Sequence, residues 1–208
     1  MVTLIRGLFM MMRLPNCVMI GFAVIVGELI ATSSIDGEAA LYGFLAGFLL
    51  LAASMVLNDY FDHEVDTINE PERPIPSGTV KPKQAISFAV VLTALGLLAA
   101  AQTGVWTLII TGFSVLVAVA YNYKFKKTGL LGNALVSANV ALPFIYGGLA
   151  VWRPTWGLLI FATLSFISSL GREVTKGIVD ATGDAAKGIR SVAVKMGNAY
   201  AAKCGNYS

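Results

Sequence analysis

Six apolar stretches, each about long enough to cross a membrane, make up most of this chain. A helix needs about 20 mostly apolar residues to span the hydrocarbon of a bilayer. Because no water is present there, such a segment must satisfy its backbone hydrogen bonds internally, as a helix. The sequence therefore predicts an all-α, polytopic transmembrane helical bundle, with spans at 16–33, 39–57, 84–101, 105–121, 132–151 and 156–170.

The bundle is expected to form one membrane-embedded domain over residues 1–208. Only 13% of the 208 residues are charged, and no stretch has the composition of a soluble domain. A seventh apolar segment begins near Asn198 and stops short, which predicts a bundle truncated after helix six or seven. Small residues in the spans should let helix backbones approach closely in lipid. These are Gly43, Gly47, Gly96, Gly112, Gly147 and Gly148.

The basic residues are distributed unevenly between the two sides of the predicted bundle. All of the 15 Lys and Arg except Arg153 and Lys203 fall before the first span or in the connections after the second, fourth and sixth. By the positive-inside rule this side is cytoplasmic. We therefore expect a multi-pass protein of the cell membrane whose working face is the cytoplasmic one. Four prolines in residues 67–82 predict a stiff extended loop on that face.

Two clusters of aspartate lie at the same membrane edge. The first contains Asn58, Asp59, Asp62 and Asp66, and the second is the segment 180–184, which begins with Asp180 and ends with Asp184. On a helix the three aspartates of the first cluster fall within about 60° of one another. Because like charges so placed repel, a cation is their natural partner, and these hard oxygen ligands suit Mg²⁺.

Neutral interpretations compete with this one. A charged helix end at a membrane surface is often only solvated, although the second cluster makes that less convincing here. Lys124, Lys126 and Lys127 could equally be membrane anchors. Glu28, inside the first span, could be a functional intramembrane acid, but we favour a side chain that snorkels to the interface. His63 should point to another helix face, into solvent.

A site with Mg²⁺ and many basic side chains suits a diphosphate, because Mg²⁺ takes phosphate oxygens as its remaining ligands. The adjoining wall is hydrocarbon. A lipid diphosphate matches both halves of such a site, whose metals and bases would stabilise the departing diphosphate. The basic residues on this side include Arg73, Lys81, Lys126, Lys127, Arg172, Lys176 and Arg190.

Beyond the aspartates, longer runs of sequence carry a family resemblance. Residues 58–66 resemble the NDxxDxxxD motif of the UbiA superfamily of intramembrane prenyltransferases, and residues 180–184 resemble its second DxxxD motif. Within the superfamily the chain is most similar to archaeal digeranylgeranylglyceryl phosphate synthases, while INEPERPIPSG is also similar to chlorophyll synthases. The other matching runs are RLPN (13–16), INEPERPIPSG (68–78), YNYKFKKTGLLGN (121–133) and the segment 171–197.

The resemblance implies a larger helical bundle, of which the last helices are missing here, and a set of site residues. One Mg²⁺ would be held by Asn58, Asp59, Asp62 and Asp66, and the other by Asp180 and Asp184. The catalytic residues would be Asp62, Asp66, Asp180, Asp184 and Lys126. The diphosphate would be bound by Asn16, Arg73, Tyr121, Lys126, Lys127, Arg172 and Lys176.

The same resemblance implies transfer of a geranylgeranyl group from geranylgeranyl diphosphate to the hydroxyl of geranylgeranylglyceryl phosphate, forming an ether lipid precursor. The expected partners are the isoprenoid diphosphate, the lipid-phosphate acceptor and membrane lipids, and no nucleic acid. A prenyltransferase for a quinone precursor or a chlorin is the alternative. A divalent cation transporter is less favoured, because transporter sites lie near the bilayer midplane. An inactive scaffold, the prenyl chain length and the oligomeric state stay open.

Overall fold

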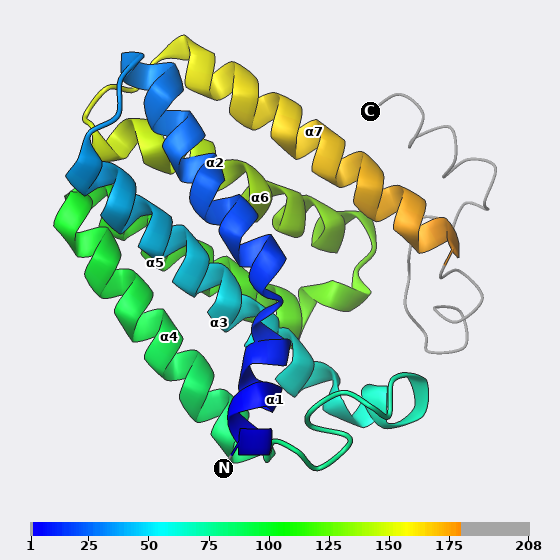
Figure 1. Cartoon of the computed structure of the whole chain (residues 1–208). Helices are drawn as coiled ribbons and strands as arrows, with labels where there is room; N and C mark the ends of the chain where they lie inside the picture. Colours follow the sequence, from blue (N-terminus) through cyan, green and yellow to red (C-terminus); the bar gives the residue numbers. More distant parts are fainter. Residues whose placement is uncertain (1, 180–208) are drawn as a thin grey trace.

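The computed structural model describes residues 2–179, with side chains for residues 3–176, and these residues form a helical bundle (Figure 1). Six of its helices are long and apolar enough to cross a membrane, which confirms the predicted polytopic all-α architecture. In chain order the elements are α1 (Val2–Met12), α2 (Leu14–Thr32), α3 (Gly37–Asn69), α4 (Pro82–Thr103), α5 (Val105–Tyr123), the 3₁₀ turn η1 (Phe125–Lys127), α6 (Leu130–Ala150) and α7 (Trp156–Val179).

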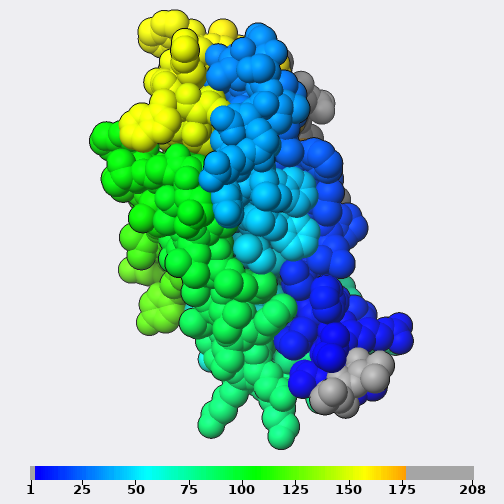
Figure 2. All heavy atoms as spheres, turned by 60° about the vertical axis from the view of Figure 1, so that its left-hand side comes forward, coloured from blue at the N-terminus to red at the C-terminus, as the bar shows by residue number. Residues whose placement is uncertain are grey.

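The connections separate to the two ends of the bundle, as the alternating topology requires. The short turns after α2, α4 and α6 lie at one end, while α1, the segment 70–81 and η1 lie at the other (Figure 1). A space-filling view shows the N-terminal helix against the lower part of the bundle, beside the residues that lead into α4 (Figure 2). The long polar connections therefore gather at one end.

Glycines let α2 and α6 pack backbone to backbone. A Cβ atom added at Gly147 would lie 2.1 Å from the carbonyl oxygen of Val24, and one added at Gly27 would lie 2.3 Å from the carbonyl oxygen of Phe144. Neither position accepts a side chain unless the helices separate. This close approach is the packing that small residues allow in lipid, where van der Waals contact holds helices together.

Helix α3 extends well beyond its apolar segment. It runs unbroken through 33 residues, a length of about 50 Å at 1.5 Å per residue, whereas the hydrocarbon of a bilayer is only about 30 Å thick. Its last turns, which carry Asn58 to Asp66, therefore continue the span toward the end where the long connections lie. The acidic cluster is therefore part of a continuous helix rather than of a loop.

Two features of this end differ from the sequence prediction. Residues 2–12 form a separate helix, α1, divided from α2 at Arg13, whose backbone adopts the left-handed conformation (φ 54°, ψ 58°). The proline-rich segment is not extended: residues 70–81 form successive tight turns, in which the Val80 amide donates to the Pro74 carbonyl at 2.8 Å. Proline limits φ but is compatible with tight turns, so both structures satisfy its geometry.

The position of the Glu28 side chain also differs from the sequence prediction. Its side chain is 1% exposed, so the snorkelling interpretation is wrong. The carboxylate accepts a hydrogen bond from the backbone N–H of Asp36, and the Asp36 side chain in turn accepts from the Glu38 and Ala39 amides at 3.0 and 3.1 Å. These bonds satisfy free N–H groups before and at the start of α3. Glu28 thus ties the end of α2 to the turn that begins α3.

Candidate active site

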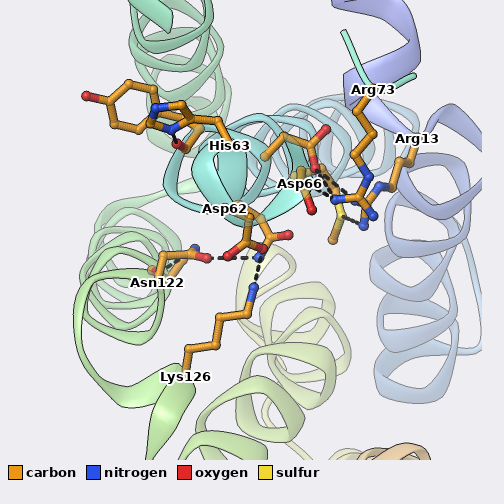
Figure 3. Close-up of polar contacts among 12 residues, drawn as sticks. Arg13, Asp62, His63, Asp66, Arg73, Asn122 and Lys126 are labelled. Carbon is orange, nitrogen blue, oxygen red and sulfur yellow. Dashed lines mark hydrogen bonds and ion pairs between the residues drawn. The ribbon is translucent and has the colours of Figure 1, made fainter. Parts of the chain in front are cut away.

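The last turns of α3 present their aspartates in two directions. Asp59 and Asp66 are each 6% exposed and lie two helical turns apart on one face. The Asp62 side chain, one turn from each, is 23% exposed and turns toward Lys126 of η1. Figure 3 shows this division, with Arg13 and Arg73 on the side of Asp66 and Lys126 approaching Asp62 from another side.

Two arginines from distant segments neutralise the buried pair. Arg13 Nη2 donates to Asp59 Oδ1 at 2.9 Å, and Arg73 Nη1 donates to Asp66 Oδ2 at 2.7 Å. Arg73 Nη1 also lies 3.7 Å from Asp59 Oδ1. Burial by itself would lower the pKa of Arg73, but the hydrogen bond to Asp66 and the charges of Asp66 and Asp59 outweigh it and raise the pKa. Arg73 therefore stays charged in this site.

Asp62 belongs to a second set of contacts. The Lys126 ammonium forms an ion pair with its carboxylate, and Asn58 Nδ2 donates to Asn122 Oδ1 at 3.0 Å. The opposite orientation of the Asn58 amide would place its nitrogen 3.3 Å from Asp62 Oδ2 and its oxygen 3.1 Å from Lys126 Nζ. Asn122 is itself held by a 2.9 Å bond to the Ala118 carbonyl. Helices α3 and α5 and the turn η1 thus meet around one carboxylate.

The other residues predicted to bind the diphosphate do not contact the aspartates of α3 in the described residues. Tyr121 is half-buried. Asn16, Lys127, Arg172 and Lys176 are exposed, and Arg172 pairs with the neighbouring Glu173 at 3.3 Å. Among the predicted basic residues in the described ranges, Arg73 and Lys126 are the two in contact with the aspartates.

Asp180 and Asp184 lie outside the described residues. Their approach to the first cluster, and with it the two-metal site, stays a prediction. His63 lies away from Asp62 and stacks on Tyr60 with ring centroids 5.9 Å apart (Figure 3). Its Nδ1 is 2.6 Å from the Tyr60 carbonyl oxygen, so it is half-buried against its own helix rather than simply solvated.

The donor set can be tested against the expected Mg²⁺. Every candidate ligand on α3 offers oxygen, either a carboxylate or an amide, which is the donor that Mg²⁺ selects. Within residues 3–176, however, no three His, Cys, Asp or Glu side chains converge closely enough to hold a metal by themselves. The chemistry of the set fits Mg²⁺, which usually keeps water and phosphate ligands beside one or two carboxylates.

Sequence reasoning missed two residues of this site. Arg13 lies in the run RLPN, where its position before the first span indicates only membrane orientation, and the family resemblance points to Asn16 instead. Asn122 lies at the end of a span, in the run YNYKFKK, where a polar residue looks like an ordinary interfacial one. In both cases the motif contained the residue, but spacing along one helix carries no information about a partner on another.

Comparison with known proteins gives the family. The UbiA prenyltransferase family matches residues 20–207. A digeranylgeranylglyceryl phosphate synthase of Methanopyrus kandleri is 36% identical over 196 residues, covering 94% of this chain and 72% of that protein. One from Korarchaeum cryptofilum is 38% identical over 186 residues, covering 89% of this chain and 66% of that protein.

Solved structures agree with the sequence comparison. A structure described as giving insights into digeranylgeranylglyceryl phosphate synthase in membranes superposes with a TM-score of 0.85 at 30% identity, covering 100% of this chain and 74% of that one. A UbiA homolog from Archaeoglobus fulgidus, bound to DMAPP and Mg²⁺, has the same fold with a TM-score of 0.75 at 20% identity, covering 99% and 72% of the two chains.

The chain belongs to the UbiA prenyltransferase family. Because residues 2–179 contain six helices long and apolar enough to cross a membrane, it is a multi-pass membrane protein.

Proposed function

We propose that the protein is a Mg²⁺-dependent prenyltransferase that moves a geranylgeranyl group from geranylgeranyl diphosphate to the hydroxyl of geranylgeranylglyceryl phosphate. The observation that carries the proposal is the arrangement on α3, where carboxylates and strong cations alternate at the end of a hydrophobic bundle. Such an arrangement suits a substrate that has an anionic and an apolar part. The kinship with digeranylgeranylglyceryl phosphate synthases supports this acceptor.

The metal ligands are proposed from the donor chemistry and from the family motifs. Asn58, Asp59, Asp62 and Asp66 would hold one Mg²⁺, and Asp180 and Asp184 the second. When bound, Mg²⁺ supplies positive charge that stabilises the leaving diphosphate as a Lewis acid. The UbiA homolog bound to DMAPP and Mg²⁺ is consistent with such a requirement.

The protein's own cations do the remaining electrostatic work. In the transfer, the bond between the allylic carbon and the diphosphate oxygen breaks, and its electron pair leaves with the diphosphate. Arg73 has a planar guanidinium with several donors, and Lys126 has a compact ammonium. Both lie beside the aspartates that would hold the metal, so both can bind phosphate oxygens as negative charge develops on the leaving diphosphate. Asp62 and Asp66 hold these two cations in place. Exposed Asn16, Lys127, Arg172 and Lys176, with Tyr121, would contribute further diphosphate contacts.

The acceptor completes the reaction with its hydroxyl oxygen. That oxygen attacks the allylic carbon, the ether C–O bond forms, and the hydroxyl proton is released. Apolar walls exclude water, which would otherwise hydrolyse the electrophilic chain. We further propose that residues 1–208 act as a single domain and that the aspartate end faces the cytoplasm, an orientation supported by the concentration of basic residues at that end.

The deciding experiment measures diphosphate release by the purified protein in lipid nanodiscs. With Mg²⁺ and geranylgeranyl diphosphate, release should require geranylgeranylglyceryl phosphate, and Asp62→Ala should abolish it. Prenylation of an aromatic acid in place of the glyceryl phosphate would favour the quinone-type alternative. Undiminished turnover in a chelator would remove the metal from the proposal altogether.

A further inference from the structure

Helix α1 packs tightly on the loop that carries Arg73. Gly7 is buried at this contact, and a Cβ atom added there would lie 2.8 Å from Val80 Cγ2, 3.0 Å from Thr79 Cγ2 and 3.6 Å from Pro74 Cβ. Val80 is 0% exposed, and a β-branched side chain has few alternative rotamers. The loop therefore rests directly on the α1 backbone, and Gly7 sets how closely it lies.

The same contact extends along α1. Met11 and Met12 are buried in one apolar cluster with Ile75 and Val80, and Leu4 and Leu8 pack against it. Hydrogen bonds across the loop turn it into a compact unit, with the Ser77 amide donating to the Arg73 carbonyl at 2.9 Å and the Val80 amide to the Pro74 carbonyl at 2.8 Å. A shift at Val80 is therefore transmitted to Arg73.

The far end of α1 meets the same aspartates. Arg13, immediately after α1, has the left-handed backbone that breaks the helix, and its guanidinium pairs with Asp59. Asp59 is also within 3.7 Å of Arg73 Nη1. Helix α1 thus packs along its length on the Arg73 loop, and just after its C-terminal end it is held by the carboxylate that Arg73 approaches.

We propose that α1 is a strut that positions Arg73 for the diphosphate, with Gly7 as its positioning residue. The proposal rests on the assignment of Arg73 to the diphosphate in the proposed function. Arg73 Nη1 lies 2.7 Å from Asp66 Oδ2 and 3.7 Å from Asp59 Oδ1, and in this proposal both distances depend on the packing of the loop on α1. A misplacement of about 1 Å in such a binding group can cost as much as roughly a hundredfold in rate.

The test compares Gly7→Val with Gly112→Val, a matched control because a Cβ at Gly112 meets nothing within 4 Å. Hydrogen exchange of residues 73–80, followed by mass spectrometry in nanodiscs, is the first measurement. Gly7→Val should raise the exchange rate of this loop roughly tenfold as its turns open, while Gly112→Val leaves it unchanged. For prenyl transfer, Gly7→Val should raise KM for geranylgeranyl diphosphate roughly tenfold, with a smaller change in KM for the acceptor.

A second pair of variants separates positioning from a general loss of folding. Gly7→Ala introduces the Cβ that meets Val80 Cγ2, and adding Val80→Ala removes that methyl group. The double variant should recover loop protection and KM relative to Gly7→Ala alone, which simple destabilisation would not produce. Unchanged exchange in Gly7→Val, or no recovery in the double variant, would overturn the strut. If exchange responds as expected but the unsubstituted protein transfers no prenyl group, the dependence of the loop on α1 is confirmed and the proposed function fails.

Discussion

Arg13 and Asp59, 46 residues apart in the chain, are joined by a 2.9 Å ion pair between Nη2 and Oδ1. The pair depends on backbone geometry, because Arg13 has a positive φ that a residue with a side chain adopts only at a cost of roughly 1–2 kcal/mol. Such strain persists where the surrounding structure holds it, often at functional sites. Here the break between α1 and α2 brings a cation to a buried carboxylate.

Replacing Arg13 should show how much this ion pair contributes to the free energy of unfolding. Arg13→Asn keeps a residue that tolerates the left-handed conformation but leaves Asp59 with Arg73 alone. We expect a loss of about 2 kcal/mol in the free energy of unfolding, less than for a fully buried pair because the Arg13 side chain is partly exposed. Denaturant titration in detergent measures it. Arg153→Asn, at the opposite end of the bundle, should change stability by less than about 0.5 kcal/mol, and an equal loss there would remove the special role of Arg13.

Lys126 and its neighbour Lys127 should contribute differently to the rate of prenyl transfer. Lys126 contacts Asp62, whereas Lys127 is exposed and has no described contact with the aspartates. Lys126→Ala should lower kcat/KM for prenyl transfer roughly a hundredfold, because a charge that stabilises the leaving diphosphate is lost. Lys127→Ala makes the same change of charge at an exposed diphosphate contact, and should lower kcat/KM by less than about tenfold, which corresponds to less than about 1.4 kcal/mol. Equal effects would indicate a diffuse electrostatic field instead of a directed contact.

The backbone contact between α2 and α6 predicts a strong effect from one methyl group. Gly147→Ala would place Cβ 2.1 Å from the Val24 carbonyl oxygen, and two helix backbones cannot rotate away from each other as a side chain can. We expect a loss of about 3 kcal/mol, at the upper end for overpacked sites, read from thermal unfolding in detergent. Gly112→Ala should be neutral or stabilising by up to about 1 kcal/mol. A neutral Gly147→Ala would contradict the close approach.

Glu28 should be replaceable by glutamine but not by leucine. Glutamine keeps an oxygen that can accept the Asp36 N–H, while leucine leaves that donor without a partner, which costs about 1–3 kcal/mol. The melting temperature of Glu28→Leu should therefore fall clearly below that of Glu28→Gln. If leucine instead raised the melting temperature, the carboxylate would have been an unfavourable buried charge rather than part of the cap.

Much of the architecture could be predicted because the bilayer restricts the possible structures. Six apolar runs required six helices, and the distribution of charge correctly grouped Arg13, Arg73 and Lys126 at one end. Helix α1 was missed because its 11 residues are too few for a span. Pro15 is typical of a helix start, but nothing in the sequence indicates the left-handed backbone of Arg13 that separates α1 from α2. The tight turns of residues 70–81 were also missed, since prolines fix φ at single positions without fixing the path of the loop.

The site could be predicted as a list of residues but not as a set of contacts. Helical spacing correctly grouped Asp59 with Asp66, two turns apart. It did not show that Asp62 turns to Lys126 while the other two turn to arginines, because that choice is made by neighbouring helices. For Glu28, the snorkelling prediction considered only the distance to the interface, whereas the turn before α3 supplied a backbone hydrogen-bond donor.

The unbroken course of α3 makes the position of its acidic residues sensitive to the number of residues in the span. A helix turns by about 100° per residue, so one residue inserted between Gly43 and Leu57 would rotate Asp59 and Asp66 away from Arg13 and Arg73 and shift them along the membrane normal. The neighbouring side chains can adjust to a substitution in this span, but they cannot compensate for an inserted or deleted residue. Among variants of this chain, insertions and deletions within α3 should therefore be rejected.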